Sequence, residues 1–430
     1  MTQPLRIGLA GLGTVGVGVV RMLQAHGDAI AARAGRPLQV VAVSARSRGR
    51  DRGVDISGYR WVDDPVSLAR DDGIDAVVEL IGGADGPALA LAETALKARR
   101  GVVTANKAMI AEHGNALARL AEANGAPLAF EAAVAGGIPI VKALREGLAG
   151  NRIERVYGIL NGTCNYILTT MRETGRAFGA VLEEAQKLGY AEADPTFDVD
   201  GIDAAHKLSI LASIAFGTEI DFAGVHIEGI RHVSPVDIAF ADELGFRIKL
   251  IGSARRTGYG VEQRVHPCMV PLAAPIAHVD GVFTAVVAQG DFVDDSVYTG
   301  RGAGAGPTAS AVVADLIDLA AGRRAPMLGV PADRLAPAKR SPMEHHVGAY
   351  YVRLMVRDRP GVIAAVSAIL RDAAISMEAI IQRGRAPDSI VPVVMTTHES
   401  EEAAMRAALA AIDGLEAMAE PARMIRIEAL

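Results

Sequence analysis

Cysteine is nearly absent from this chain of 430 residues, which contains only Cys164 and Cys268. Two such cysteines exclude a disulfide framework, and they lack the paired spacing of a structural zinc site. Aromatic residues make up only 4% of the chain. No apolar run reaches the length of about 18 residues that a membrane-spanning helix requires. We therefore expect neither a membrane protein nor a small disulfide-stabilised domain.

Concentrated positive charge is also missing. The net charge is −6, and the lysines and arginines are scattered, so no surface for nucleic acid is indicated. The first residues, MTQPLRIGLAGLG, lack the basic and apolar regions of a secretory signal. We expect a cytoplasmic protein with neither nucleic-acid nor membrane partners. The length predicts two or three domains.

A glycine-rich turn near the start carries the first chemical signal. Apolar spacing predicts a strand over Leu5–Gly11 and a helix over Val15–Ala25, and between them lies G-x-G-x-x-G. In a dinucleotide site the first glycine makes the turn, the second admits the pyrophosphate and the third lets the helix approach the strand. A packing turn without a ligand is the alternative. The candidate cofactor-binding residues here are Gly11, Gly13, Thr14, Val15 and Gly16.

The next predicted strand, Leu38–Val43, bears on the choice of cofactor. An NAD site usually has an acidic residue near this strand end, but the chain continues SARSRGR and reaches no acid before Asp51. Small polar and basic residues, Arg46 among them, suit a 2′-phosphate. NADP is therefore favoured and NAD stays open, with a solvated basic loop as the alternative.

Two further strand-to-loop units follow, Asp75–Ile81 and Gly101–Lys107. The second ends in polar residues that include Thr104 and Lys107. Ligands of open α/β sheets bind at the carboxyl ends of strands, where a lysine can contact a phosphate or a substrate carboxylate. A plain loop charge is the alternative for Lys107. Alternating strands and helices predict an α/β fold with a Rossmann-type doubly wound parallel sheet.

The densest cluster of ionisable residues lies between Gly189 and Lys207, where five carboxylates fall within twelve residues. Asp203 and Lys207 are four residues apart and share one helix face. A surface ion pair, a calcium loop or a catalytic pair are all compatible, although the spacing departs from the EF-hand pattern. Glu131, before a glycine turn, offers either oxygen ligands for a hard cation or a simple turn. Cys164 is expected to be half-buried rather than a nucleophile.

The last part of the chain begins with a proline-rich linker, Pro326–Pro342. Strands are predicted over Ala349–Val356, Ile390–Thr396 and Ala422–Ile427, and helices run from Val362 to about Ala373 and over Glu401–Ile412. The β-α-β-β-α-β order, with Asp-Arg-Pro-Gly in its first turn, resembles the ferredoxin-like ACT domain. That resemblance implies amino-acid sensing, most naturally of L-threonine. A domain that only strengthens assembly is the alternative.

The motifs together resemble the homoserine dehydrogenase family along nearly the full length. The matching segments are GLAGLGTVG, VTANKAMIAEHG, FEAAVAGGIPIV, ILNGTCNYIL, GYAEADPTFDVDGIDAAHKLSILA and GRGAGAGPTASAVV. The resemblance implies reversible NAD(P)H-dependent reduction of L-aspartate 4-semialdehyde to L-homoserine, on the route to threonine, isoleucine and methionine. It also implies a homodimer or homotetramer.

Residue roles follow from the same resemblance. Lys207 is expected to be the acid–base group or to hold the water that is, Asp203 to orient it, and Lys107 to lie at the nicotinamide edge. The implied substrate-binding residues are Gly189, Glu192 and Asp198. The further cofactor-binding residues are Arg46, Thr104, Lys107, Gly189 and Gly304. A monovalent cation such as sodium is implied at Glu131, Val134, Gly136 and Ile138.

The resemblance divides the chain into four parts. Residues 1–135 form the cofactor domain, completed by a helix at about 305–325, and residues 136–304 form an α+β catalytic and dimerisation domain. Residues 326–345 are a linker and 346–430 the ACT domain. Two rival functions are a sensor without turnover, which would not need Lys207 and Asp203, and a semialdehyde dehydrogenase, which would need an activated cysteine.

Overall fold

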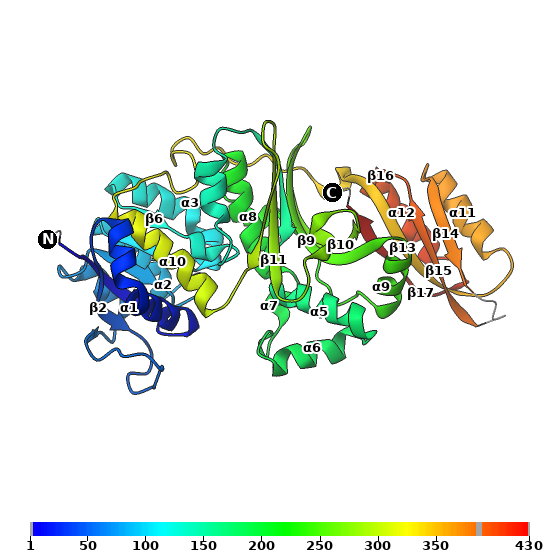
Figure 1. Ribbon diagram of the computed structural model, residues 1–430. Helices are drawn as coiled ribbons and strands as arrows, with labels where there is room; N and C mark the ends of the chain where they lie inside the picture. The colour runs from blue at the N-terminus through cyan, green and yellow to red at the C-terminus, as the bar shows by residue number, and fades with distance from the viewer. Residues whose placement is uncertain (1–2, 384–388, 429–430) are drawn as a thin grey trace.

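Two β-sheets organise the chain in the computed structural model, which describes residues 3–383 and 389–428. Figure 1 shows three bodies in a row, with the N-terminal body at one end and the C-terminal body at the other. No helix within the described ranges is long and apolar enough to cross a membrane.

The first sheet has six parallel strands in the order β3-β2-β1-β4-β5-β6. The strands are β1 Leu5–Ala10, β2 Leu38–Ser44, β3 Arg60–Trp61, β4 Ala76–Glu79, β5 Gly101–Thr104 and β6 Leu128–Ala129. Helices α1 Thr14–Ala34, α2 Pro87–Lys97 and α3 Lys107–Asn124 connect them. β4 and β5 are buried along their whole length, as expected for strands covered on both faces. The predicted doubly wound parallel sheet is confirmed.

A helix from much later in the chain completes this body. α10 Ala305–Ala320 packs along α1, so close that a Cβ on Gly18 would lie 2.6 Å from the Ala305 carbonyl oxygen. The return of this helix to the first body matches the expectation from its alanine- and valine-rich sequence. α1 itself runs beyond its predicted end at Ala25, with a non-helical residue at His26.

The second sheet is mixed and has the order β12-β11-β7-β9-β10-β17-β13-β15-β14, with β8 on β10 and β16 on β13. Its middle-body strands are β7 Ile153–Ile159, β8 His226–Ile227, β9 Phe246–Thr257, β10 Gly260–Pro271, β11 Phe283–Gly290 and β12 Asp294–Arg301. The helices are α4 Ile140–Lys142, α5 Gly162–Thr174, α6 Phe178–Lys187, α7 Thr196–Val199, α8 Ile202–Phe216 and α9 Pro235–Glu243.

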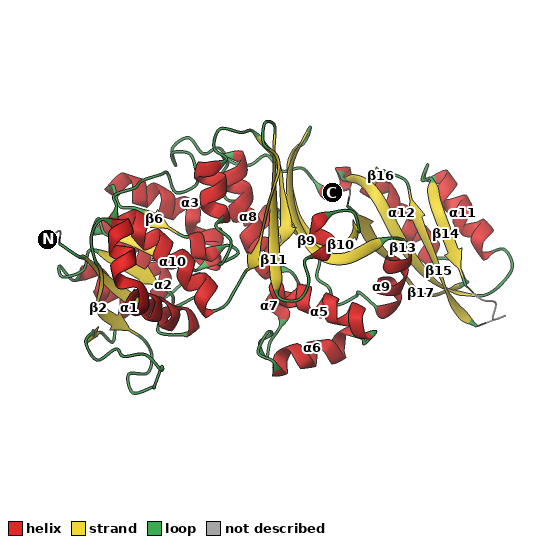
Figure 2. Cartoon of the chain, viewed as in Figure 1, coloured by secondary structure: helices red, strands yellow, loops and turns green. Residues whose placement is uncertain are grey.

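Helix α8 is the central element of the molecule. Nearly all of its residues are buried, because it packs on β7, β9 and β10 on one side and on α3 on the other. Figure 2 shows it between the N-terminal body and the long strands of the middle sheet. Side chains at the start of α8 therefore lie where the two bodies meet.

The C-terminal body has the predicted β-α-β-β-α-β order with one short strand added. Its elements are β13 Val347–Arg357, α11 Val362–Asp372, β14 Met377–Gln382, β15 Ile390–Thr397, β16 Ser400–Glu401, α12 Glu402–Asp413 and β17 Met418–Ile427. α11 and α12 close a core over one face of its strands. The body is not a separate sheet, however, because β17 pairs with β10 at Cys268↔Arg426 and Met269↔Ile427.

The proline-rich connection between the bodies is packed against the protein. The Val261 N–H donates to the Lys339 carbonyl at 2.7 Å, and the Glu219 N–H donates to the Ala336 carbonyl at 2.9 Å. Arg340 forms an ion pair with Asp221 at 2.7 Å. Together with the β10–β17 pairing, these contacts tie the C-terminal body to the middle one.

Candidate active site

The start of α8 carries a buried cluster of ionised side chains. Asp203 stands in the first turn, and Lys207 lies one turn further, with Nζ 2.7 Å from Asp203 Oδ2. Lys107, the first residue of α3, directs Nζ to the other carboxylate oxygen at 2.7 Å. The Asp203 and Lys207 side chains are only 4% and 10% exposed, which excludes a surface ion pair. One carboxylate therefore faces two ammonium groups.

Asn161 is a member of this cluster that the sequence interpretation missed. Its Nδ2 donates to Asp198 Oδ1 and to Asp203 Oδ2, both at 2.8 Å. Its Oδ1 accepts from the Cys164 N–H at 2.8 Å and caps α5. The only sequence signal is an asparagine directly before the segment that forms α5, and it indicates a helix cap rather than a contact with two distant carboxylates.

The pKa values in the cluster are displaced in opposite directions. Burial lowers the pKa of Lys207, and the Lys107 charge adds to this while Asp203 opposes it. Burial also acts to lower the pKa of Lys107, but the carboxylates of Asp203, Asp198 and Glu192 together outweigh it and the net shift of the pKa is upward. Burial and the Asp203 charge raise the pKa of Asp198. Of the two lysines, Lys207 is thus the better proton donor.

Two neighbours of the cluster serve as packing rather than as chemistry. Cys164 is fully buried, not half-buried as expected, its thiol donates to the Asp198 carbonyl at 3.2 Å, and burial raises its pKa well above the usual value. A protonated thiol is no nucleophile. His206 lies between Phe197 and Phe222, and burial lowers its pKa to about 4, so the imidazole is neutral near pH 7.

The loop before α7 places the other predicted substrate residues at the edge of the cluster. Gly189 has a φ of +75°, and the Glu192 carbonyl accepts from Gln186 Nε2 at 3.0 Å. The exposed Glu192 side chain makes no hydrogen bond within the described residues, but its charge acts on Lys107. Asp198 is thus in the hydrogen-bonded cluster, and Glu192 faces it from the solvent side.

The glycine turn after β1 has the geometry that its sequence predicts. Gly11 has a φ of +102°, and a Cβ on Gly16 would lie 1.9 Å from the Gly11 carbonyl oxygen. A Cβ on Gly13 would meet no atom within 4 Å, so this position is open to a ligand. Thr14 and Val15 begin α1 directly behind it. The turn leaves backbone N–H groups at a helix N-terminus free to face an anion.

A cavity of about 530 Å³ opens at this turn. It extends from Gly11 and Gly13 to the loop after β2, where Ser44, Arg46 and Ser47 line it. Two further arginines, Arg50 and Arg52, lie on the same side. Of the predicted cofactor residues, Gly11, Gly13 and Arg46 therefore line one cavity, whose wall after β2 carries three arginines beside Asp63.

Thr104 and Gly304, the other predicted cofactor residues of this part of the fold, lie outside the lining of this cavity. The buried Thr104 hydroxyl donates to Glu79 Oε2 at 2.6 Å, and Glu79 Oε1 accepts from the Ile81 and Gly82 N–H groups at 2.7 and 3.1 Å. The Thr104 side chain therefore orders the loops after β4 and β5. Gly304 precedes α10 with a φ of +117°, and the adjacent Ala305 contacts α1 at Gly18.

The predicted cation residues form a buried oxygen-rich turn. Glu131 is 2% exposed, and its carboxylate accepts the Val141 and Lys142 N–H groups at 3.0 and 2.8 Å. Burial and the nearby Asp315 raise the pKa of Glu131 to about 7. Within residues 3–383 and 389–428, the carbonyls of Val134 and Gly136 accept no hydrogen bond. Lys142 pairs with Asp315 at 3.1 Å, and the unpaired buried carbonyls beside the Glu131 carboxylate fit a hard monovalent cation.

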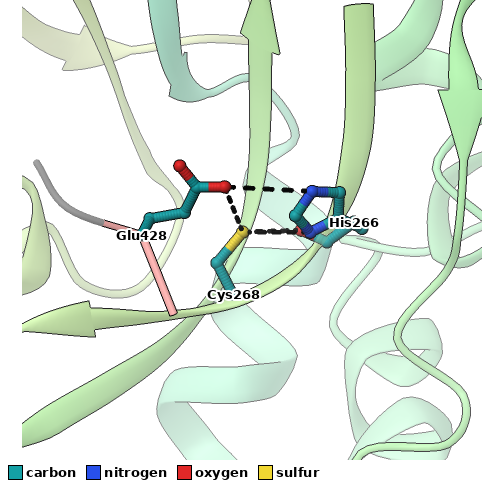
Figure 3. A group of neighbouring side chains, drawn as sticks. All are labelled: His266, Cys268 and Glu428. Carbon is teal, nitrogen blue, oxygen red and sulfur yellow. Dashed lines mark hydrogen bonds and ion pairs between the residues drawn. The ribbon is translucent and has the colours of Figure 1, made fainter. Parts of the chain in front are cut away.

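A second buried group lies at the junction of β10 and β17. Cys268 Sγ is 3.1 Å from His266 Nδ1 and 4.0 Å from Glu428 Oε1 (Figure 3). Such a triad resembles a metal-ligand set, but Arg155 and Arg264 both hold the Glu428 carboxylate at 2.7 Å. The two guanidinium charges beside Glu428, the one carboxylate of this triad, oppose the binding of a further cation. The group instead joins the middle and C-terminal bodies.

The fold and the cluster define the class of protein. A Rossmann-type sheet with a dinucleotide turn, and a buried lysine–carboxylate group at its carboxyl edge, belong to an NAD(P)-dependent oxidoreductase. The chain belongs to the homoserine dehydrogenase family. Family models match for the homoserine dehydrogenase NAD-binding domain at residues 11–131, for homoserine dehydrogenase at 139–317 and for the ACT domain at 350–414.

Individual relatives agree over the full length. A homoserine dehydrogenase from Pseudomonas aeruginosa is 47% identical over 100% of both chains, and one from Neisseria gonorrhoeae is 45% identical over 100% of this chain and 99% of its own. The crystal structure of a homoserine dehydrogenase from Thiobacillus denitrificans superposes with a TM-score of 0.94 at 47% identity, covering 99% and 98% of the two chains. A hyperthermophilic archaeal homoserine dehydrogenase in complex with NADPH superposes with a TM-score of 0.64 at 28% identity, covering 76% of this chain and 100% of that one.

Proposed function

We propose that the chain catalyses the reversible NAD(P)H-dependent reduction of L-aspartate 4-semialdehyde to L-homoserine. The observation that carries the proposal is the buried Lys107–Asp203–Lys207 group beside the cofactor domain. The family relationship supports the substrate. No activated cysteine supports a semialdehyde dehydrogenase, because the thiols of both Cys164 and Cys268 are buried and burial raises the pKa of each.

The reaction needs a positive charge and a proton at the aldehyde oxygen. When bound, the nicotinamide supplies hydride to the aldehyde carbon. The Lys207 ammonium stabilises the negative charge that develops on the oxygen and donates the proton, a step that its lowered pKa favours. Asp203 holds the Lys207 side chain in place, and the Leu160 carbonyl accepts from the same ammonium at 2.8 Å. Lys107 adds a second positive charge at the nicotinamide edge.

The amino-acid end of the substrate is assigned to the loop before α8. Its ammonium group would be bound by the carboxylates of Asp198 and Glu192, with the backbone at Gly189 completing the contact. Asn161 supports Asp198 in this role, because its amide hydrogen bond favours the ionised carboxylate.

NADP is the proposed cofactor, with NAD as the weaker alternative. Arg46 at the basic end of the cavity would pair with a 2′-phosphate, which carries charge that the NAD ribose lacks. The pyrophosphate would lie on the turn from Gly11 to Gly16, including Thr14 and Val15. Gly304 and the backbone near Thr104, Lys107 and Gly189 would contact the rest of the cofactor.

A monovalent cation such as sodium is proposed at Glu131, Val134, Gly136 and Ile138. It would lie between the first and middle bodies, where the turn contacts the segment before α10 through the hydrogen bond from Gly137 N–H to the Arg301 carbonyl at 2.9 Å. Replacing sodium by choline should lower the melting temperature of the protein, and Glu131→Gln should remove that difference.

The regulatory and assembly assignments extend the same proposal. The domain limits predicted above are retained, and the middle body is proposed to form the interface of a homodimer or homotetramer. L-threonine is the proposed effector of the ACT domain. A cytoplasmic location remains a prediction from the sequence.

Turnover itself tests the function. NADPH oxidation with L-aspartate 4-semialdehyde should be observed with the wild-type protein and should fall at least about a hundredfold in Lys207→Ala. Lys97→Ala is the matched control, because Lys97 forms only an exposed pair with Glu93. Absence of wild-type turnover with both NADPH and NADH would overturn the assignment and favour a sensor without catalysis.

A further inference from the structure

The C-terminal strands present two different faces. On β13, Tyr350, Val352 and Leu354 point into the core beneath α11 and α12. The alternate residues Tyr351 and Arg353 point the other way, toward α9 of the middle body. There the Tyr351 hydroxyl and Arg353 Nε donate to Asp237 Oδ1 at 3.0 and 2.7 Å. This second face is therefore the contact between the regulatory and catalytic parts.

A pocket of about 330 Å³ lies beside that contact. It is bounded by the loop after β8, by α9 and by β17, so both bodies contribute to its wall. Val233, Pro267 and Ile425 give it an apolar side, whereas Arg423 and His232 give it a basic side. Its volume lies at the lower end of the range of about 300–1,000 Å³ for small-molecule sites.

Arg423 is the uncompensated charge of this pocket. In the sheet it stands directly opposite Arg353, so two guanidiniums are paired across antiparallel strands. Asp237 neutralises Arg353 and also accepts from the Ser234 hydroxyl at 2.7 Å. Arg423 has no hydrogen-bond or ion-pair partner among residues 3–383 and 389–428. Like charges placed opposite one another are unfavourable, and Asp237 offsets the charge of Arg353 but is not bonded to Arg423.

The remaining acid at the rim is already bonded. Glu228 accepts from Arg426 Nη1 at 2.9 Å, from His226 Nε2 at 2.8 Å and from Arg406 at 3.3 Å. It therefore has little capacity left to neutralise Arg423. Both carboxylates of the lining, Glu228 and Asp237, are thus bonded to other side chains, and the Arg423 guanidinium lies next to an apolar wall without a partner among the described residues.

We propose that this pocket binds a small carboxylate with a short aliphatic body, such as a free amino acid, through the guanidinium of Arg423. A guanidinium matches a carboxylate with two parallel hydrogen bonds. The apolar wall from Val233 to Ile425 takes the aliphatic part. The site is separate from the substrate cluster at Asp198 and from the Asp-Arg-Pro-Gly turn at Asp358–Gly361, and it does not depend on the reaction assigned above.

A ligand in this place bridges two bodies of the chain. It contacts β17 on one side, and on the other it contacts α9, which packs on α5. Any ligand that binds only the assembled junction stabilises that junction by mass action. Binding is therefore expected to raise the melting temperature of the wild-type protein.

Isothermal titration calorimetry of the full chain tests the proposal with four probes: L-threonine, L-valine, 3-methylbutanoate and inorganic phosphate. We expect at least one carboxylate to bind with a dissociation constant below about 5 mM, which corresponds to more than about 3 kcal/mol of binding free energy. Arg423→Met should weaken that binding at least about tenfold. Arg423→Lys should lose part of it, because the ammonium keeps the positive charge but cannot make two parallel hydrogen bonds to the carboxylate.

Arg371→Met is the matched control and should leave binding unchanged. The Arg371 side chain is exposed on α11, which covers the opposite face of the same strands. Circular dichroism melts establish that each variant is folded. Equal carboxylate binding by wild type and Arg423→Met would place the ligand elsewhere and overturn the proposal. Binding of phosphate alone, or of none of the four probes, would overturn it as well.

Discussion

Lys207 and Asp203 form a buried ion pair with 2.7 Å between Nζ and Oδ2, and Lys107 takes the other oxygen of the same carboxylate. The pKa of Lys207 therefore depends on two neighbours that act in opposite senses. Asp203 raises it and Lys107 lowers it, on top of the lowering by burial. Substitution of either neighbour should therefore change the pKa of the proposed proton donor, in opposite directions.

The first prediction uses that opposition. Reduction needs protonated Lys207, so the rate falls as pH rises through its pKa. Lys107→Met removes a positive charge and should move this basic limb to higher pH, whereas Asp203→Asn removes a negative charge and should move it to lower pH. Both variants should also lose turnover. The measurement is kcat for NADPH oxidation between about pH 6 and pH 10.

Lys187→Met, at the end of α6, is the control for Lys107→Met, because it removes the same single positive charge. Its basic limb should coincide with that of the wild-type protein. Shifts of the same sign in Lys107→Met and Asp203→Asn would show that Lys207 is not the group that titrates.

The second prediction concerns Asn161, which donates to both Asp198 and Asp203. The hydrogen bond to Asp198 lowers a pKa that burial and Asp203 raise. Asn161→Ala should therefore raise the Asp198 pKa further. An ionised Asp198 is needed to bind the substrate ammonium, so KM for the semialdehyde should increase as pH falls. In Asn161→Ala this increase should begin at a higher pH than in the wild-type protein.

Asn165 provides a matched comparison on the same helix. It is also buried, but its Nδ2 donates to the backbone carbonyls of Val279 and Phe283 at 2.9 and 3.0 Å. Asn165→Ala should lower the melting temperature and leave the pH dependence of KM in place. If both variants displace the acidic limb equally, Asn161 has only a structural role.

The sequence predicted the fold better than it predicted the site. Glycine spacing and strand–helix alternation are local signals, and they located the turn at Gly11 and four of the six parallel strands, β1, β2, β4 and β5, but not the two-residue strands β3 and β6. The contact between Lys107 and Asp203 joins residues 96 positions apart. No periodicity encodes such a contact, and only the family resemblance placed both residues in one site.

Two sets of hydrogen bonds, those of Asn161 and of Thr104, were not predicted, because the local sequence around each residue indicates a different role. Asn161 resembles an ordinary helix cap, since one amide oxygen does cap α5 while the nitrogen acts on residues much later in the chain. The hydrogen bond from the Thr104 hydroxyl to Glu79 was not predicted either, and the place of Thr104 at the cofactor stays a prediction. Glu79 is a buried glutamate in strand β4, and no sequence pattern identifies Thr104 as its partner.

The third prediction concerns cofactor choice. Arg46 lines the cavity that begins at Gly13. Arg46→Met should increase KM for NADPH by about tenfold, the typical loss of one charged hydrogen-bonded contact, and should change KM for NADH by less than about twofold. Arg70→Met, which removes an exposed arginine outside the cavity lining, is the control. An equal loss with both cofactors would assign Arg46 to the pyrophosphate or to the loop structure.

The fourth prediction addresses the junction between the middle and C-terminal bodies. Glu428 accepts from Arg155 and Arg264 at 2.7 Å, and all three side chains are largely buried. Glu428→Gln leaves two guanidiniums facing an amide N–H₂ group, and removing one partner of a buried ion pair typically costs about 3–5 kcal/mol. Urea unfolding should therefore show a large destabilisation at pH 7. Glu93→Gln, at an exposed pair with Lys97, should cost at most about 1 kcal/mol.

The difference in unfolding free energy between wild type and Glu428→Gln should depend on pH, because the pKa of Glu428 is lowered in the folded protein. Although burial opposes it, Arg264 and Arg155 hold the pKa of Glu428 well below its usual value. A lowered carboxyl pKa contributes stability above the unfolded-state pKa of about 4.3, and this contribution is lost as pH falls further. The gap between wild type and Glu428→Gln should therefore be constant from about pH 8 to pH 6 and should narrow below about pH 4. A gap that persists unchanged into that acidic range would mean that the variant acts through packing rather than through the lost charge.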